Sequence, residues 1–455
     1  MNRTIGHLGI RYATAARFEP PVPVAFAGIG SEAGTAGPIA PQVPGLLENL
    51  LGMDVGSMSE DCLHLNVFRP ADAVPGSDLP VLVWVHGGAF QNGSGSIPWY
   101  DGSSLASRGT VVVTINYRLG ALGFLGRRNS GTLDQICALG WVRDNISAFG
   151  GDAGNVTIFG ESAGGSGVLA LLAAPGAKGL FHRVWSMSPS IRQLRDVAAA
   201  EKWEAAFLSE LGVGTIDEAR DAGLDRILGA QARVAAMPND GYDMFAPTAG
   251  GDGLDADFDA AFGSSDLPVV IGTNRDENSL FLAFDPEVAG CSHDKWVAHA
   301  RAHFGGAADH AIARYEEHRP SATPAQLIAA VQTDHVFRRP AQRVAESRVA
   351  AGNQTWMYWF TWATPVFDGA LGSCHALDIP FAFDNIHAQG SEMLLGTGPE
   401  RAGIAARFAD EICRFAREGS AGWPAFDLRD RTTLRIDEEC EVLNDPEPAL
   451  RLLHE

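Results

Sequence analysis

The sequence predicts an α/β fold in which helices flank an open, mainly parallel β-sheet. The first observation is a set of short, continuous, β-branched apolar runs, which are typical of strands buried on both faces of a parallel sheet. The second is that longer helical patterns separate these runs. The third is size: 455 residues, 46% of them hydrophobic and 20% charged, suffice for a large core and are not typical of a disordered chain.

Strands and helices can be assigned from these patterns. The predicted strands cover 81–85, 111–115, 156–159, 268–272 and 356–360. The predicted helices cover 133–149, 162–173, 199–211, 325–350 and 401–417. The first 45 or so residues are rich in Gly, Pro and Ala and are expected to be irregular. Because chemistry in open parallel sheets lies at the carboxyl ends of the strands, the segments that follow the strands hold the candidate site.

Charge and composition exclude several classes of protein. With 34 basic and 55 acidic residues the net charge is −21, which disfavours nucleic-acid and anionic-membrane partners. No apolar run is long enough for a transmembrane helix, and the N-terminus lacks the apolar core of a secretory signal. Six scattered cysteines are expected to be reduced thiols. We therefore expect a soluble, cytoplasmic protein, and its oligomeric state stays open.

The pentapeptide Gly160-Glu161-Ser162-Ala163-Gly164 follows one predicted strand and opens a predicted helix. This is the G-x-S-x-G pattern in the strand–turn–helix setting that its mechanism requires. The glycines permit a sharp turn that lifts the Ser162 hydroxyl above the sheet, and the helix N-terminus directs N–H groups at a reacting oxygen. The alternative is a Gly/Ser-rich turn without chemistry. The context favours a nucleophilic serine.

A second glycine-rich turn, His86-Gly87-Gly88-Ala89-Phe90, ends the predicted strand 81–85. Small residues here let backbone N–H groups converge on a substrate oxygen, and such a turn commonly accompanies a nucleophilic serine. The alternative is a tight strand-end turn. We expect His86 to be a structural residue of this turn and not the catalytic base.

An acid and a histidine must complete the site, because a serine hydroxyl needs a base to take its proton. In α/β-hydrolases the order along the chain is Ser, acid, His. Asp276 and Glu277 follow the predicted strand 268–272, and position alone neither chooses between them nor excludes a solvated loop. His375 lies in a loop after the predicted strand 356–360, but spacing does not decide among the 13 histidines.

Longer motifs occur in the order typical of one family. They are SEDCLHLNVFRP, VWVHGGAFQNGSG, TINYRLGALGFL, WVRDNISAFGGDAGNVTIFGESAGG, GTNRDENSLF and CHALDIPFAFDN, then WPAF and TTLRID. With these motifs the chain resembles the type-B carboxylesterase/cholinesterase family, in particular its bacterial para-nitrobenzyl-esterase-like carboxylesterases. The resemblance implies an α/β-hydrolase fold as a single domain over 1–455. It also implies a mainly helical insertion or cap region over 200–350 that contains the strand and loop of the acid.

The resemblance also implies a role for each matching residue. The nucleophile, the acid and the general base would be Ser162, Glu277 and His375. The backbone N–H groups that bind the oxyanion would be those of Gly88, Ala89 and Ala163. Ser188 would be a buried serine that steadies the acid, and Glu161 would organise the pocket. Asp276 is expected to pair with an arginine, such as Arg275 or one from a packed helix, and to support the fold.

Two departures from the family pattern are visible. Ala40 stands where secreted members carry the cysteine that pairs with the equivalent of Cys62, so that disulfide is not expected and a reducing compartment is. Asn278 stands where the family usually has glycine after the acid.

The expected function is that of a serine carboxylesterase acting on small-molecule esters with short- to medium-chain acyl groups, through an acyl-enzyme intermediate. No metal and no organic cofactor is expected to be needed. One alternative is hydrolysis of carbamates or aryl amides by the same triad. Another is a non-catalytic binding protein of the cholinesterase-like kind, which the retained Ser162, Glu277 and His375 disfavour.

Overall fold

The computed structural model describes residues 3–29, 34–45, 56–237 and 244–455. Within these residues the main element is a ten-stranded sheet, in the order β1-β4-β6-β5-β7-β8-β9-β10-β11-β12. Its strands are β1 (Thr4–Arg11), β4 (His64–Pro70), β5 (Leu79–Val85), β6 (Val111–Ile115), β7 (Gly151–Glu161), β8 (Arg183–Met187), β9 (Val269–Asn274), β10 (Thr355–Phe360), β11 (Thr432–Ile436) and β12 (Glu441–Asn444). From β6 to β11 all neighbours are parallel, whereas β1, β4 and β12 pair antiparallel at the edges. Separate from it, β2 (Ala13–Thr14) and β3 (Val22–Pro23) form a small ribbon.

Strand β5 shows why the central strands are apolar at every position. Its alternating residues Val81, Val83 and Val85 belong to one buried cluster, together with α4 (Ser130–Asn145) and α5 (Ala163–Ala170). Leu82 and Trp84 belong to a second cluster, together with α17 (Glu400–Glu418). Successive side chains of a strand point to opposite faces. A strand covered by helices on both faces therefore cannot alternate between polar and apolar residues.

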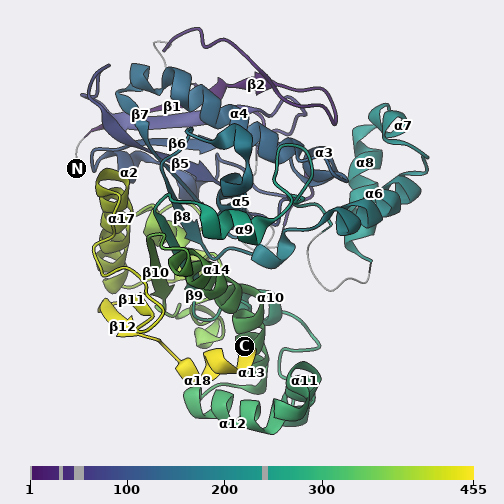
Figure 1. Ribbon diagram of the computed structural model, residues 1–455, viewed down its shortest axis with the longest axis vertical. Coiled ribbons are helices and arrows are strands. Elements are labelled where there is room, and N and C mark those ends of the chain that lie inside the picture. The colour runs from purple at the N-terminus through teal and green to yellow at the C-terminus, as the bar shows by residue number, and fades with distance from the viewer. Residues whose placement is uncertain (1–2, 30–33, 46–55, 238–243) are drawn as a thin grey trace.

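Two groups of helices extend beyond this layered core (Figure 1). One is a lateral projection formed by α6 (Val197–Leu211), α7 (Ile216–Arg220) and α8 (Leu224–Ala235). The other lies at the lower end of the view and contains α11 (His293–Phe304), α12 (Ala308–His318), α13 (Pro324–Thr333) and α18 (Pro448–Arg451). The remaining α-helices are α2 (Ser103–Ala106), α3 (Gly120–Phe124), α9 (Phe258–Ser264), α10 (Ser279–Leu282), α14 (Arg339–Ala350), α15 (Ile379–Ala382) and α16 (Glu392–Leu395).

The predicted elements are present, with two differences. The predicted strands correspond to β5, β6, β7, β9 and β10, and the predicted helices to α4, α5, α6, α17 and the 325–350 segment. That last segment is α13 and α14 joined by a π-helix, η7 (Asp334–Arg338). The expectation that the first 45 or so residues are irregular is wrong at β1, which pairs with β4, and at the short ribbon of β2 and β3. Partners distant in sequence hold this edge strand, and composition does not reveal them.

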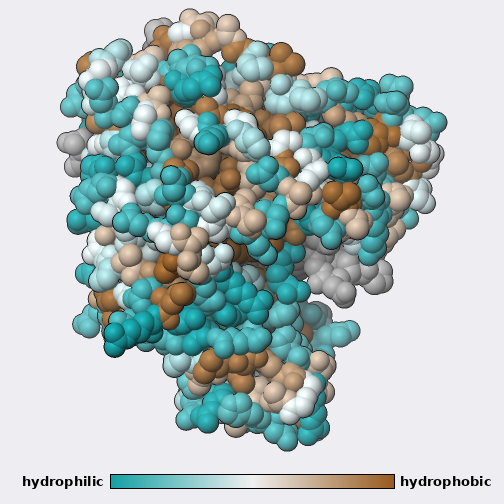
Figure 2. Space-filling view, viewed as in Figure 1, coloured by the Kyte–Doolittle hydropathy of each residue, from teal (hydrophilic) through white to brown (hydrophobic). Residues whose placement is uncertain are grey.

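The predicted insertion over 200–350 consists mostly of helices, and β9 is its strand among the described residues. Because β9 lies between β8 and β10, the segment contributes to the sheet as well as to the surrounding helices. Its division from the rest of the fold stays a prediction. In the part of the chain that is described, no helix combines the length and the apolar character needed to cross a membrane. The face seen in Figure 2 carries mostly hydrophilic residues, with smaller apolar areas among them.

Candidate active site

Ser162 occupies a strained turn between β7 and α5. Its backbone angles, φ 58° and ψ −122°, lie where few residues other than glycine are found. The turn is held by a hydrogen bond from the Ser162 N–H to the Met187 carbonyl (2.9 Å). A methyl group on Gly164 would come within 2.0 Å of the Val85 oxygen, so only glycine permits this approach. The fold therefore presents the serine hydroxyl at the carboxyl end of the central strands.

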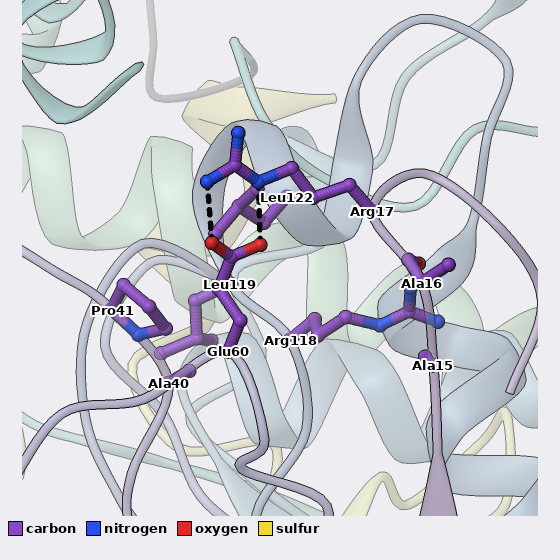
Figure 3. Close-up of a pocket in the computed structure, with 9 residues that line it drawn as sticks. All are labelled: Ala15, Ala16, Arg17, Ala40, Pro41, Glu60, Arg118, Leu119 and Leu122. Atoms are coloured by element: carbon purple, nitrogen blue, oxygen red, sulfur yellow. Dashed lines mark hydrogen bonds and ion pairs between the residues drawn. The ribbon is translucent and has the colours of Figure 1, made fainter. Parts of the chain in front are cut away.

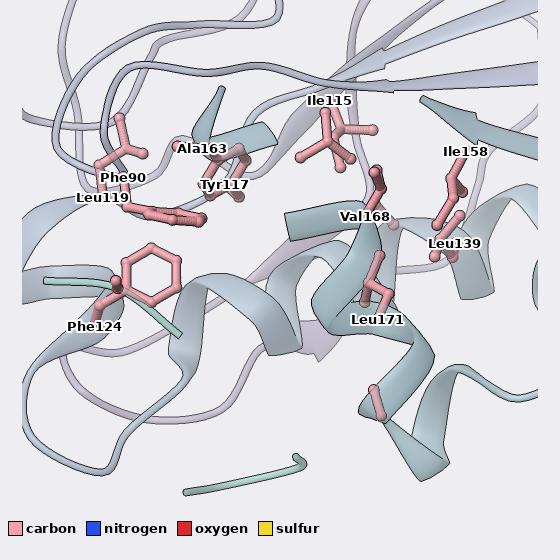
Figure 4. Close-up of a cluster of buried hydrophobic side chains, with 14 of the residues drawn as sticks. Phe90, Ile115, Tyr117, Leu119, Phe124, Leu139, Ile158, Ala163, Val168 and Leu171 are labelled. Carbon is pink, nitrogen blue, oxygen red and sulfur yellow. The ribbon is translucent and has the colours of Figure 1, made fainter. Parts of the chain in front are cut away.

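A tightly packed apolar cluster supports this turn from below (Figure 4). Ala163, Val168 and Leu171 from the α5 side pack with residues of β6, β7 and the loops after β5 and β6. Phe90 and Phe124 meet edge to face, with ring centroids 5.1 Å apart, and both are fully buried. These two rings belong to the core and do not line a substrate pocket. Dense packing of this kind holds a strained backbone in place.

The glycine-rich turn after β5 lies directly against Ser162. A methyl group on Gly87 would be 3.2 Å from the Ser162 Cβ. Gly88, Ala89 and Phe90 all have positive φ, and the Gly88 carbonyl accepts hydrogen bonds from the N–H groups of Gln91 (2.9 Å) and Asn92 (3.0 Å). The Gly88 carbonyl and the Ala89 N–H belong to the same trans peptide and point in opposite directions. The Ala89 N–H is therefore directed away from the hydrogen bonds that close the turn.

His86 is a structural residue of this turn. Its ring is buried, stacks on Tyr117 at 4.5 Å and has Nδ1 2.8 Å from the Gly87 carbonyl. The Tyr117 hydroxyl donates to the His86 carbonyl (2.7 Å). Burial lowers the pKa of His86 to about 4. A neutral ring that is already engaged with the backbone matches the structural role expected from the sequence.

Glu277 and His375 meet at the carboxyl ends of β9 and β10. The Nδ1–H of His375 donates to Oε2 of Glu277 (2.6 Å), and both side chains are buried. The other oxygen, Oε1, accepts the backbone N–H of Asn274 (2.7 Å). The Asn274 amide also donates to the Cys374 carbonyl (2.7 Å), and this bond joins the two loops. Such an arrangement fixes the orientation of the imidazole and leaves Nε2 directed elsewhere.

Asp276 faces away from the histidine. Its carboxylate accepts from the Arg319 guanidinium (2.9 Å) and from the Ser373 N–H (3.0 Å). Arg319 is the residue that caps the C-terminal end of α12, so the partner is an arginine at the end of a helix and not Arg275. The two neighbouring acids that sequence position left undivided therefore have separate partners.

Two further carboxyl groups surround His375. Oε1 of Glu161, the residue before Ser162, lies 3.2 Å from His375 Nε2. Burial raises the pKa of Glu161 to about 8. Asp378 is also buried; it accepts from Asn274 (3.3 Å) and from the Tyr358 hydroxyl (3.2 Å), and burial followed by repulsion from Glu277 raises its pKa to about 7.

The charge around His375 favours its protonated form. Burial lowers the pKa of His375, but the carboxylates of Glu161 and Glu277 outweigh burial and raise the pKa to about 9. Phe281 and Phe337 border the ring, with centroids 5.3 and 4.8 Å from it. The site thus stabilises an imidazolium inside an apolar shell, which is what a base that accepts a proton during a reaction requires.

Two expected contacts are not made among the described residues. The Ser162 hydroxyl makes no hydrogen bond to His375, whose Nε2 lies 3.2 Å from Oε1 of Glu161. The Ser188 hydroxyl is buried without a hydrogen-bond partner, and the backbone N–H of Asn274 holds the acid instead. Asn278, at the departure from the family pattern, has its N–H bonded to the Thr333 hydroxyl (3.0 Å), so the turn after the acid accommodates it.

Sequence reasoning missed Asp378, Asn274 and Phe337. Asn274 lies in the family motif GTNRDENSLF and Asp378 in CHALDIPFAFDN. The motifs therefore pointed to both residues, but their positions in the sequence did not indicate what they do. Phe337 lies on η7, in a segment predicted only as a helix, and nothing local indicates that its ring reaches His375.

A small pocket near the N-terminal segment lies outside this site (Figure 3). Arg17 crosses it and pairs with Glu60 (2.6 Å), and its guanidinium also donates to the Arg220 carbonyl (2.9 Å). None of the predicted site residues lines this pocket. Its polar groups satisfy one another and tie the N-terminal segment to α7.

Comparison with known proteins finds carboxylesterases and related hydrolases along nearly the whole chain. The carboxylesterase family model matches residues 2–449. Para-nitrobenzyl esterase from Bacillus subtilis (strain 168) is 37% identical, over 96% of this chain and 91% of the relative. Phenmedipham hydrolase from Pseudarthrobacter oxydans is 34% identical, over 91% and 87%. A probable N-octanoylanthranilate hydrolase from Rhodococcus erythropolis is 35% identical, over 92% and 91%.

Solved structures extend the comparison to the fold. The carboxylesterase EST55 of Geobacillus stearothermophilus superimposes with a TM-score of 0.86 at 34% identity, and the match covers 100% of this chain and 97% of that one. A para-nitrobenzyl esterase structure gives a TM-score of 0.84 at 34% identity, covering 100% and 96%. The expected α/β-hydrolase fold is confirmed, and so is the family resemblance seen in the sequence. The chain belongs to the type-B carboxylesterase family.

Proposed function

We propose that this protein is a serine carboxylesterase that cleaves short- to medium-chain carboxylic esters through an acyl-enzyme intermediate. The observation that carries the proposal is the pairing of Glu277 with His375 Nδ1 at 2.6 Å, beside the strained turn that carries Ser162. An isolated ion pair would serve the fold equally well. Its coincidence with a strained serine and a left-handed glycine turn is what favours chemistry.

In the proposed reaction Ser162 Oγ attacks the ester carbonyl while His375 Nε2 takes its proton. Glu277 holds the imidazole in the correct tautomer and stabilises its charged form. The N–H groups of Gly88, Ala89 and Ala163 would receive the oxyanion, because the turn after β5 and the first turn of α5 flank the serine. His375 then protonates the leaving alcohol, and water activated by the same base releases the acid.

The missing Ser162–His375 hydrogen bond is compatible with this mechanism. Catalytic hydrogen bonds are often long or poorly aligned without substrate and shorten in the complex. Oε1 of Glu161 lies 3.2 Å from Nε2 and forms an ion pair with the ring when His375 is protonated. None of these steps requires a metal or an organic cofactor.

Labelling with a fluorophosphonate tests the nucleophile. The probe should attach to Ser162 with loss of activity, and an unlabelled but folded protein would contradict the proposal. A panel of p-nitrophenyl esters from acetate to palmitate tests the acyl preference, which we expect to fall between roughly C2 and C8, because the sequence has no apolar lid segment of the kind that lipases use at interfaces. Faster hydrolysis of emulsified long-chain triglyceride would contradict it.

Hydrolysis of carbamates or aryl amides by the same triad is a second candidate. It is favoured by the relative whose name identifies N-octanoylanthranilate, an N-acyl compound, as its substrate. The same triad would attack either carbonyl, and the leaving group decides the rate. Comparing kcat/KM for an aryl ester, the matched aryl amide and the matched carbamate separates the two candidates.

A further inference from the structure

Three histidines that are far apart in sequence converge at the lower end of the molecule, beside the C-terminus. His303 lies on α11, His335 on η7 and His454 in the 3₁₀-helix η9 (Leu452–His454). One ring nitrogen of each lies within 4.8 Å of one ring nitrogen of the other two. The ring centroids of His303 lie 4.7 Å from His335 and 5.5 Å from His454. Figure 1 shows α11 and the C-terminus in the same lower group of helices.

This spacing is close to what a tetrahedral ion demands. Two nitrogens that bind one Zn²⁺ are roughly 3.3 Å apart, given bonds of about 2.0–2.1 Å. All three rings are partly exposed, so small side-chain rotations can close the difference. Three imidazoles with an open fourth position suit Zn²⁺, Cu²⁺ and Ni²⁺ better than Mg²⁺ or Ca²⁺, which prefer oxygen ligands.

A buried polar relay orients one of the rings. The Tyr315 hydroxyl donates to Oδ2 of Asp334 (2.7 Å) and lies 2.8 Å from Nε2 of His454. Since its proton goes to Asp334, the hydroxyl can only accept from His454, so the His454 proton lies on Nε2 and the lone pair on Nδ1. Metal-binding histidines typically donate their second N–H to such a partner, which fixes the tautomer.

The local charges act in both directions. Burial, followed by neighbouring positive groups, lowers the pKa of His335 to about 4 and that of His454 to about 3, and burial also lowers the pKa of His303. A neutral imidazole is the form that binds a cation, and an ordinary histidine is already mostly neutral at pH 7. Arg192 and Arg343 are among those positive groups and oppose a cation, so binding should be weaker than at a closed structural zinc site.

We propose that His303, His335 and His454 bind a divalent transition-metal ion, with Zn²⁺ as the ion that best suits the ligand set, and that this ion fastens the C-terminal segment onto α11 and η7. The C-terminal segment consists of the short helices α18 and η9. Without the ion it is held by bonds such as that from the Arg343 guanidinium to the His454 carbonyl (2.9 Å). The proposal concerns structure and does not depend on the proposed esterase chemistry.

Calorimetric titration tests the site directly. The full chain without a polyhistidine tag is stripped with EDTA, dialysed and titrated with ZnCl₂. We expect one ion per chain with a dissociation constant on the order of micromolar. His303→Gln and His335→Gln should each weaken binding by about 10- to 100-fold. The matched control is His310→Gln, which changes an exposed histidine of α12 outside the cluster and should leave binding unchanged.

Thermal unfolding and Co²⁺ absorption give independent readouts. Saturating Zn²⁺ should raise the Tm of the unaltered protein and of His310→Gln but not that of His303→Gln. Co²⁺ should give the visible bands of a tetrahedral site in the same two proteins. Circular dichroism confirms that each variant is folded. The proposal is wrong if a folded His303→Gln/His335→Gln double variant binds Zn²⁺ as tightly as the unaltered chain, or if the unaltered chain binds none at millimolar concentration.

Discussion

The two halves of the candidate site are built in different ways. On the nucleophile side, Gly160–Gly164 and His86–Phe90 are contiguous segments whose backbone angles and close contacts follow from their glycines. On the acid–base side, Glu277 and His375 are 98 residues apart and meet only because loops after β9 and β10 bond to each other. The first half is a local motif, whereas the second is a product of parallel strand pairing.

This difference has an energetic counterpart. On the nucleophile side the backbone of Ser162 is strained, and the dense apolar cluster around α5 prevents it from relaxing. The acid–base side stores electrostatic energy, because three buried carboxyl groups surround one imidazole. Changes to Ser162 or to the glycine turn after β5 should therefore act on the reaction without altering the titration of His375. Changes to the carboxyl groups around His375, including Glu161 of the serine turn, should alter its titration as well.

The largest effect is expected for Ser162→Ala. It removes one hydroxyl from the local half and keeps the backbone, so kcat should fall by about 10⁶ while the fold stays intact. Single-turnover assays on a p-nitrophenyl ester, with circular dichroism for folding, check this. Ordinary turnover by a folded variant would remove the nucleophile from the proposed mechanism.

Glu277→Gln should cost about 10³–10⁴ in kcat, since the side chain keeps its shape but loses the charge that fixes the tautomer of His375. Steady-state kinetics on the same ester measure it. A variant that retains full kcat would show that the contact at 2.6 Å serves only the fold.

Glu161→Gln tests the electrostatics that link the two halves. His375 must be neutral to act as a base, and its pKa, lowered by burial but raised further by Glu161 and Glu277, is about 9. Activity should therefore rise with pH up to that region. Removing the Glu161 charge lowers the pKa of His375, so the acidic limb of kcat/KM should move to lower pH by about one unit. An unmoved limb, or one shifted upward, would contradict this account.

The smallest effect on kcat is expected for Asp276→Asn, the matched control for Glu277→Gln. Asp276 pairs with the buried Arg319 and not with the histidine. The variant should keep kcat within about tenfold but lose about 2–3 kcal/mol of unfolding free energy, because Arg319 loses a charged partner. Urea unfolding and ester kinetics measure both. If this variant is the inactive one, the assignment of the acid is reversed.

The sequence predicted the central strands and the longer helices because their signals are local. Continuous apolar runs such as 111–115 can only be buried on both faces, and that run coincides with β6. Strand β1 escaped prediction because it is an edge strand with Gly6 and Gly9, and pairing with β4 is what makes it a strand. The π-helical turn η7 also escaped, because an i→i+5 turn inside a long helix leaves no mark in the pattern.

By itself the sequence determined the fold class, the strained serine turn, the glycine turn beside it and the family, because each depends on residues adjacent in the chain. Position along the chain did not separate the two neighbouring acids; the family resemblance named Glu277, and the structure places that carboxylate against His375. Only the tertiary structure decided which arginine holds Asp276 and that Phe337 borders the imidazole. The same holds for the cluster of His303, His335 and His454, whose spacing matches no metal-binding motif. The physical reason is that the energy between charged groups depends on their distance in space. Folding brings together groups that lie far apart in the sequence, and no local pattern shows which of them will meet.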